Sequence, residues 1–127
     1  MKETITILIP VYNDNESLRM TLQDIGKLQT DILNNISIVI VNDGSTGFSV
    51  QRSNSSNGIT VIHLNRNLGH QKAIAIGLSY ISENHKDSNV IVMDCDGEDR
   101  VPDIPMLLEE NRKNNSTIIF AKRKRRT

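Results

Sequence analysis

The sequence predicts an α/β domain with a mainly parallel sheet and helices on both faces. Short runs rich in Ile, Leu and Val recur along the 127 residues, and stretches with helical periodicity separate most of them. These runs lack the strict alternation of polar and apolar residues that a half-exposed strand shows, as expected where both faces of a sheet are covered. Aromatic residues make up only 3% of the chain, so aliphatic side chains must form the core.

The first half of the chain predicts two strands and one helix. Residues 4–10 (TITILIP) form the first apolar run and predict a buried strand. Residues 16–28 predict a helix, because four apolar side chains fall on one face. Those four are Leu18, Leu22, Ile25 and Leu28. Residues 36–41 (ISIVIV) predict the second strand, whereas the polar residues 47–58 predict a loop with at most a short helix.

The second half predicts three strands and two helices. The strands are residues 59–64 (ITVIHL), 89–93 (NVIVM) and 117–121 (TIIFA). Residues 70–82 predict a helix with an apolar inner face, and residues 103–113 predict another helix that follows a proline. The inner face of the first of these helices carries Ala73, Ile74, Gly77, Leu78 and Ile81.

No shift in composition marks a second domain, so residues 1–121 are expected to form one unit, followed by a basic tail over residues 122–127. The tail holds five of the 15 Lys and Arg residues, which leaves 10 basic against 15 acidic residues in the body. An acidic body is unlike a nucleic-acid-binding domain, whose basic residues should line one face. We therefore expect no nucleic-acid partner.

Composition also disfavours membrane and disulfide-rich classes. No apolar run approaches the ~18 residues of a membrane span, and the first three residues lead straight into a strand-like run rather than a signal peptide. Cys95 is the single cysteine, so neither an intrachain disulfide nor a cysteine-rich zinc site is expected. A reducing, cytoplasmic setting follows from this pattern.

Several familiar motifs are missing. No Gly-x-Gly-x-x-Gly follows the first strand and no Gly-x-x-x-x-Gly-Lys-Ser/Thr occurs, which disfavours a nicotinamide dinucleotide site and a P-loop. Nothing matches a nucleophile elbow. A receiver domain of two-component signalling would place its phosphoacceptor Asp after the third strand, where this chain has Leu64 and Asn65.

The strongest chemical signal is a group of four carboxylates within six residues, directly after the fourth strand: Asp94, Asp96, Glu98 and Asp99. If the segment stays extended, Asp94, Asp96 and Glu98 point the same way, and their repulsion favours a bound cation. Oxygen ligands select hard divalent ions, which predicts a Mg²⁺ or Mn²⁺ site. The alternative is a solvated acidic loop that caps the next helix.

Other polar residues follow the first three strands, at the sheet edge where open α/β folds bind ligands. Tyr12, beside Asp14, either stacks on a base or is simply a half-buried aromatic. Asp43 either accepts a hydrogen bond from a base or ribose or only shapes a turn. The helix that begins at His70 and includes Lys72 offers N–H groups and a cation to phosphate oxygens.

Four motifs, in this order and spacing, resemble the family-2 glycosyltransferases of the GT-A fold. They are residues 7–14 (ILIPVYND), 39–46 (VIVNDGST), 67–73 (NLGHQKA) and 94–96 (DCD). Within that family the chain is similar to the polyprenyl-phosphate sugar transferases, which resemble dolichyl-phosphate mannosyltransferase. The resemblance implies a Rossmann-like GT-A fold, of which this chain would be the nucleotide-binding half.

The resemblance also implies roles at the nucleotide. Pro10, Tyr12 and Asp14 would border the nucleobase, and Asp43 would hydrogen-bond to it. Gly69 and Lys72 would complete the substrate-binding set near the phosphates.

At the metal, the resemblance implies that Asp94 and Asp96 are the catalytic pair. Asp94 would contact ribose or the metal, and Asp96 would hold the metal on the donor diphosphate. Glu98 falls where the branch uses a Gln as a further metal ligand, so its extra charge would alter ion affinity. Arg123 and Arg126 lie near the position of phosphate-binding arginines in that branch.

The implied reaction is inverting transfer of a sugar from a nucleoside-diphosphate sugar. A polyprenyl phosphate acceptor is already anionic, whereas a saccharide hydroxyl would need a general base. A lipid acceptor would place the protein at the membrane surface.

The acceptor half would be absent from a chain of this length, which we expect to transfer sugar poorly alone. A homodimer that covers the exposed sheet edge is a further expectation. Two alternatives remain, a non-catalytic sugar-nucleotide-binding remnant and an interaction module that uses the basic tail.

Overall fold

A computed structural model describes residues 4–31, 36–50, 58–95, 101, 104–114 and 118–121 of the protein. Its elements in chain order are β1 (Ile5–Val11), α1 (Asn15–Asp31), β2 (Ile36–Asn42), β3 (Ile59–His63), α2 (His70–Asn84), β4 (Asn89–Met93), α3 (Ile104–Asn114) and β5 (Ile118–Ala121). Every strand and helix that the apolar periodicity predicts is present, with ends that differ by at most three residues. The predicted α/β class is confirmed.

The five strands form one parallel sheet in the order β3-β2-β1-β4-β5. From β1 the chain moves outward through β2 to β3, then crosses back through α2 to β4 on the other side of β1. Open α/β sheets bind ligands at such a reversal, beyond the carboxyl ends of the strands. Residues 48–50 between β2 and β3 are not helical, and residues 51–57 lie outside the described part of the chain.

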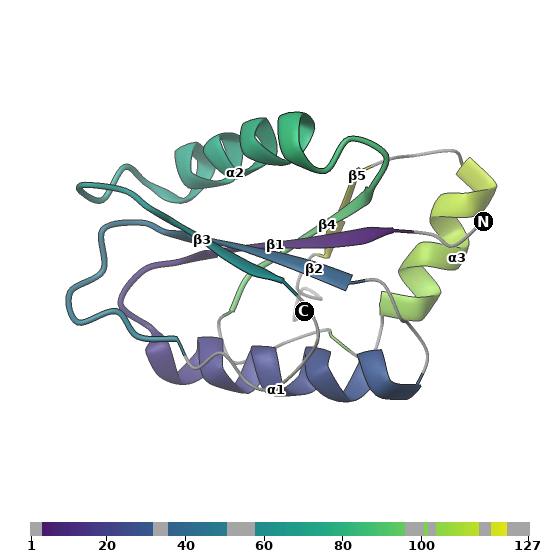
Figure 1. Ribbon diagram of the computed structural model, residues 1–127, viewed down its shortest axis with the longest axis horizontal. Helices are drawn as coiled ribbons and strands as arrows, with labels where there is room; N and C mark the ends of the chain where they lie inside the picture. Colours follow the sequence, from purple (N-terminus) through teal and green to yellow (C-terminus); the bar gives the residue numbers. More distant parts are fainter. Residues whose placement is uncertain are drawn as a thin grey trace, which may run out of the picture.

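Helices cover both faces of the sheet, with α2 above it and α1 below it in Figure 1. One buried cluster joins β1, β2 and β4 to α1 and α3, and β1 contributes Ile5, Ile7, Ile9 and Val11 to it. The second cluster lies under α2 and takes Leu8 from β1. Successive side chains of a strand point to opposite faces, so β1 needs apolar residues at nearly every position. This is why its sequence shows no polar alternation.

Gly77 brings α2 close to the sheet. It is buried on the inner face of the helix, together with Ala73 and Ile81. A Cβ at Gly77 would collide with the side chain of Leu8, which is itself fully buried. The helix therefore packs on β1 through a position that has no room for a side chain.

The two edges of the described sheet are β3 and β5. On β5 the large side chains of Ile118 and Phe120 are exposed, and the homodimer expected at such an edge stays a prediction. None of the helices in the described residues has both the length and the hydropathy that a membrane crossing requires.

Replacing Gly77 and Gly26 by Ala should have opposite effects on stability. Ala is the better helix residue by roughly 0.5–1 kcal/mol, and a Cβ at Gly26 in α1 meets no atom within 4 Å. Gly26→Ala should therefore raise the free energy of unfolding. Gly77→Ala should lower it by about 1–3 kcal/mol, because overpacking against Leu8 outweighs helix propensity. Urea denaturation of both variants measures the two signs, and a stabilised Gly77→Ala protein would contradict the packing described here.

Candidate functional site

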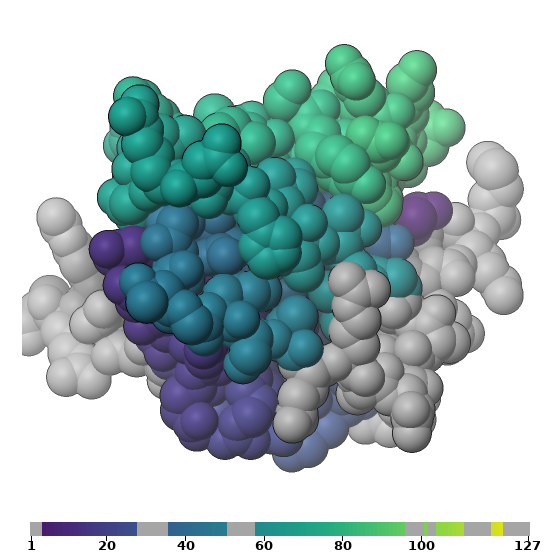
Figure 2. Space-filling view, turned by 60° about the vertical axis from the view of Figure 1, so that its left-hand side comes forward, coloured from purple at the N-terminus to yellow at the C-terminus, as the bar shows by residue number. Residues whose placement is uncertain are grey.

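A cavity of about 260 Å³ opens at the carboxyl ends of β1 and β2. Its lining comes from three segments and consists of Pro10, Val11, Tyr12, Asp43, Asn67, Gly69 and His70. In Figure 2, which brings this end of the sheet forward, residues that follow β2 (blue) lie between α1 (purple) below and α2 (teal to green) above. The fold thus brings together four residues that the sequence assigns to substrate binding, namely Pro10, Tyr12, Asp43 and Gly69.

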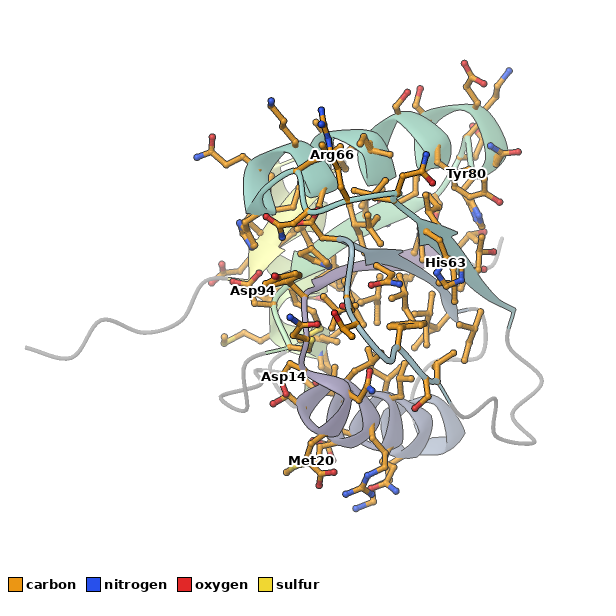
Figure 3. The ribbon with its side chains drawn as sticks, turned by 90° about the vertical axis from the view of Figure 1, so that its left-hand side faces the viewer. Asp14, Met20, His63, Arg66, Tyr80 and Asp94 are labelled. Carbon is orange, nitrogen blue, oxygen red and sulfur yellow. The ribbon has the colours of Figure 1, made fainter. Side chains whose placement is uncertain are left out.

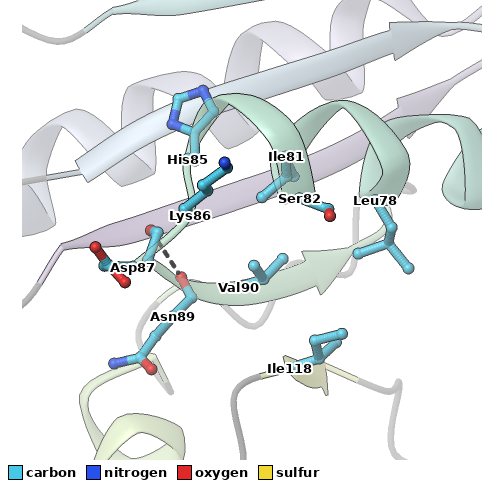
Figure 4. Close-up of a pocket in the computed structure, with 10 residues that line it drawn as sticks. Leu78, Ile81, Ser82, His85, Lys86, Asp87, Asn89, Val90 and Ile118 are labelled. Atoms are coloured by element: carbon cyan, nitrogen blue, oxygen red, sulfur yellow. Dashed lines mark hydrogen bonds between the residues drawn. The ribbon is translucent and has the colours of Figure 1, made fainter.

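A larger cavity of about 480 Å³ lies at the opposite end of the sheet (Figure 4). It is formed by the end of α2 and the start of β4, with Leu78, Ile81 and Val90 among its apolar walls. None of the motif residues lines it. Volume alone therefore does not identify a candidate site, and the smaller cavity is the one that the motif residues line.

Asp43 lines the smaller cavity and is almost fully buried, with only 3% of the residue exposed. Its backbone N–H donates to Val11 O (2.9 Å), which extends the β1–β2 pairing by one step. Its Oδ1 accepts the N–H of Leu68 (2.7 Å), and its Oδ2 accepts the N–H of Gly69 (3.1 Å) and the Nδ2 of Asn67 (3.0 Å). A buried carboxylate needs such donors, because desolvation of an unpaired charge is costly.

Two glycines allow the loop before α2 to lie against the end of β2. Gly44 has φ 77°, and a Cβ there would collide with the backbone of Arg66 and Asn67. Gly69, at the start of α2, has φ 102°, a conformation that favours glycine. At Gly44 backbone meets backbone, so this position has no room for a side chain.

Tyr12 and Asp14 have different surroundings although both follow β1. Tyr12 is 53% exposed and lines the cavity, so its ring is free to receive a flat ligand. Asp14 is absent from the lining, and its Oδ1 instead accepts the N–H of Ser17 (3.1 Å). This is an N-cap contact, which satisfies one of the open donors in the first turn of α1.

An ion pair lies one turn further along the surface of α1. Arg19 Nη2 donates to Glu16 Oε1 (2.5 Å), which lowers the pKa of Glu16 and raises the pKa of Arg19. Both side chains are exposed, so this pair contributes little to stability. The cavity does not depend on it.

His70 joins the first turn of α2 to the end of β4. Its Nε2 lies 2.5 Å from Oδ1 of Asp94, and both side chains are about half exposed. Figure 3 views this end of the sheet directly, with Asp94 on the side of α2 and Asp14 beside α1. Sequence reasoning assigned His70 and Asp94 to separate motifs and missed their contact. Lys72, two residues further along α2, is exposed and does not line the cavity.

The predicted metal site is described only in part. Asp94 is exposed and offers carboxylate oxygens, which fit Mg²⁺ or Mn²⁺. Asp96 and Glu98 lie outside the described residues, as do Arg123 and Arg126 in the basic tail. Within the described ranges no group of three His, Cys, Asp or Glu side chains is arranged to hold an ion. The metal site stays a prediction.

Comparison with known proteins identifies the family. The model of glycosyl transferase family 2 matches residues 6–127, almost the whole chain. This chain belongs to glycosyl transferase family 2. The resemblance that the four motifs indicate is therefore confirmed.

Two relatives illustrate how much of a family-2 protein this chain covers. The uncharacterized glycosyltransferase YkcC of Bacillus subtilis (strain 168) is 30% identical over 125 residues, which cover 95% of this chain and 37% of the relative. The undecaprenyl-phosphate 4-deoxy-4-formamido-L-arabinose transferase of Pseudomonas fluorescens (strain SBW25) is 34% identical over 112 residues, which cover 84% of this chain and 31% of the relative. The chain spans about a third of the length of these curated relatives.

A pair of reciprocal hydrogen bonds shapes the rim of this family-2 domain. Asn13 donates its backbone N–H to Ser45 Oγ (2.8 Å), and its Oδ1 accepts the N–H of Thr46 (2.8 Å). Nearby, Asn15 Nδ2 donates to Gly47 O (2.8 Å). The loops that follow β1 and β2 are thereby fastened to each other beside the cavity. Asn13 has φ 52°, a conformation that Asn tolerates better than most residues.

Substitutions of Asn13 should separate its hydrogen bond from its backbone conformation. Asn13→Gly keeps the positive φ but loses the bond to Thr46, at a cost of about 1 kcal/mol. Asn13→Ala loses the same bond and adds ~1 kcal/mol of backbone strain. We expect the free energy of unfolding to fall in the order Asn, Gly, Ala, as measured by chemical denaturation. Equal stability of all three proteins would show that the side-chain bond from Asn13 to Thr46 contributes nothing.

Proposed function

We propose that the cavity at the carboxyl ends of β1 and β2 binds the nucleoside diphosphate of a sugar donor. The observation that carries this proposal is that three of the four motifs meet around one cavity at the strand reversal of a family-2 glycosyltransferase domain. Tyr12 offers an exposed ring for a base, and Pro10 and Asn67 also line the cavity. A largely preformed concave site with a few polar groups is typical of small-molecule binding.

The start of α2 suits the phosphates of such a donor. Gly69 and His70 line the cavity, and the first turn of a helix presents N–H groups and a positive dipole end. Lys72 is exposed on the same turn, so its ammonium group is available to an anion at this end of the helix. These features support a diphosphate between α2 and the end of β4.

The divalent ion would be held by Asp94 and Asp96, with Glu98 as a further ligand. When bound, it would neutralise charge on the departing nucleoside diphosphate. On the protein side, His70, which lines the cavity, contacts the Asp94 carboxylate at 2.5 Å. The carboxylate is thus already oriented between α2 and β4.

The proposed reaction is an inverting displacement at the anomeric carbon of the donor sugar. An oxygen of the acceptor forms the new bond to carbon while the bond to the diphosphate breaks, and the diphosphate leaves with the electron pair. A polyprenyl phosphate is the acceptor that we favour, because it needs no general base, and the relative from Pseudomonas fluorescens is named as an undecaprenyl-phosphate 4-deoxy-4-formamido-L-arabinose transferase. Arg123 and Arg126 would face the phosphates of donor or acceptor.

Titration with UDP and GDP, with and without Mn²⁺, tests this proposal against its alternatives. Metal-dependent binding together with sugar transfer to a polyprenyl phosphate supports a transferase. Metal-dependent binding without transfer favours a non-catalytic remnant. This outcome is measured in a longer family-2 protein that contains this domain. No binding of either nucleotide would favour an interaction module.

Tyr12→Ala should weaken nucleotide binding. An aromatic ring that stacks on a base contributes roughly 1–3 kcal/mol by alanine substitution, which corresponds to about 5- to 150-fold in affinity. Tyr12→Phe is the matched control, because it keeps the ring and removes only the hydroxyl. Calorimetric titration of both variants measures the effect, and equal losses in the two would assign the contribution to the hydroxyl instead.

Asp96→Ala should abolish the metal-dependent part of nucleotide affinity. Removal of one carboxylate from a hard-ion site removes a ligand that water replaces only weakly. The matched control is Asp87→Ala, an exposed carboxylate at the larger cavity on the opposite end of the sheet. We expect Mn²⁺ to strengthen UDP or GDP binding in the control and to have no effect in Asp96→Ala. Unchanged metal dependence in Asp96→Ala would contradict the assignment.

A further inference from the structure

A histidine at the end of β3 supports the loop after β2 from outside the cavity. His63 is the last residue of β3 and pairs with Asn42, the last residue of β2. The Nδ2 atom of Asn42 lies 3.0 Å from Nδ1 of the His63 ring. Asn42 is only 5% exposed, whereas His63 is exposed and lies at the opposite side of this end of the sheet from Asp94 (Figure 3). A solvent-accessible ring is therefore joined to a buried amide.

The other end of the same amide fixes its orientation. Oδ1 of Asn42 accepts the backbone N–H of Ser45 (3.0 Å). Because an amide oxygen only accepts, the oxygen must face Ser45 and the NH₂ group must face His63. Nδ1 of His63 must then be the acceptor. A neutral ring offers this acceptor only in the tautomer that carries its proton on Nε2.

The His63 ring also contacts the loop directly. The rings of Phe48 and His63 pack edge to face, with centroids 5.4 Å apart and an angle of 86° between the ring planes. Phe48 in turn packs against the buried cluster that joins the sheet to α1. His63 is thus attached to the loop twice, through Asn42 to Ser45 and through Phe48.

A proton on Nδ1 does not fit this arrangement. The charged ring carries N–H groups at both nitrogens, so Nδ1–H would point at the NH₂ group of Asn42. Turning the amide over would satisfy His63 but would place the NH₂ group against the N–H of Ser45. In either case two donors meet and one hydrogen bond of a buried amide is lost, which is costly. A charge on His63 and the bond from Asn42 to Ser45 therefore exclude each other.

The groups that pack against His63 are themselves uncharged. They are Asn42 on β2 and Phe48 in the loop after it. At the start of α1, which covers the same face of the sheet, Glu16 and Arg19 pair with each other. In the described part of the chain no carboxylate forms an ion pair with His63. The other charged residues of the adjoining elements are Asp14, Asp24 and Lys27 before and on α1, Asp43 after β2 and Arg66 after β3.

We propose that His63 is a proton-sensitive latch for the loop after β2. The neutral ring holds Ser45 in place through Asn42, and the protonated ring releases it. Histidine changes its charge between ~pH 5 and ~pH 8. Because the latch needs the neutral ring, its stabilising contribution is present at the upper end of this range and is lost as the pH falls. The loop begins at Asp43, which lines the cavity, so we expect the released loop to weaken nucleotide binding. This last step rests on the proposed function, whereas the latch itself does not.

Two variants fix the latch in one state. His63→Asn keeps it closed at every pH, because its amide oxygen takes the place of Nδ1 and does not titrate. His63→Phe keeps it open, because it retains a ring against Phe48 but offers no acceptor to Asn42. The matched control is His85→Gln, which removes a histidine at the larger cavity on the opposite end of the sheet.

Nuclear magnetic resonance of the ligand-free proteins between ~pH 8 and ~pH 5 tests the latch. At the upper pH the ring nitrogens of His63 should show the tautomer protonated on Nε2. As the pH falls, the Ser45 amide signal should shift together with the His63 ring in wild type and in His85→Gln, but not in His63→Asn. The protection of the Ser45 amide against hydrogen exchange, relative to an unstructured peptide at the same pH, should drop roughly two- to tenfold in wild type. In His63→Phe it should be low at both pH values.

Calorimetric titration of UDP and GDP tests the link to the cavity. Wild type and His63→Asn should have equal affinities at ~pH 8, and wild type should be weaker by roughly two- to fivefold at ~pH 5. Other acid-sensitive groups, such as His70 and Asp94, are present in both proteins, so their effects cancel in this comparison. The same pH dependence in both proteins would overturn the link between the latch and the cavity.

Three results would overturn the latch. They are a His63 ring protonated on Nδ1 at ~pH 8, a Ser45 amide that does not follow the His63 ring, and a His63→Asn protein whose Ser45 amide titrates as in wild type. The first two are measured in wild type and hold even if a variant does not fold. If wild type binds neither UDP nor GDP, the proposed function fails, and the resonance signals alone then decide whether His63 holds the loop.

Discussion

Burial of the central strand on both faces is the constraint on which this structure depends. β1 is hydrogen-bonded to β2 and β4 along its edges, while α1 and α2 cover its two faces. Almost no position within it can hold a polar side chain, and Thr6, the exception, is satisfied by Ser88. Polar chemistry is therefore confined to the ends of the strands. Parallel pairing brings all the carboxyl ends to one edge, so residues far apart in the sequence meet there without any long excursion of the backbone.

The fold could be predicted from the sequence because its signals are local. A run such as residues 36–41 is apolar at nearly every position, and this alone indicates a strand covered on both faces. Helix ends were less predictable, since α1 continues to Asp31 although its apolar face ends near Leu28. The last turn of a helix depends on what the chain contacts next, which periodicity does not encode.

The candidate site could be predicted as a set of residues but not as a set of contacts. Tyr12 and Asp43 stand out because they follow strands that share one edge, whereas Pro10 and Gly69 are assigned through the family resemblance. The contact between His70 and Asp94 was not predicted, because it joins the start of α2 to the end of β4 and depends on the strand order. Sequence spacing indicates which residues share an edge of the sheet, whereas strand order and loop conformation decide which of them touch.

Hydrogen bonds of the buried side chains of Asn42 and Asp43 hold the loops at this edge of the sheet in place. At this rim the loops pack few large side chains, and buried polar groups take their place: Asn42 accepts the N–H of Ser45 and donates to His63, while Asp43 accepts three donors from the next loop. A buried polar group left unpaired costs more than its bond contributes, so each such group permits only one arrangement of its neighbours. Hydrophobic packing tolerates small shifts, but a carboxylate with three aligned donors does not. The conformation of the loops that line the cavity therefore depends on hydrogen-bonded polar atoms. The apolar sheet behind the cavity determines only where these loops begin.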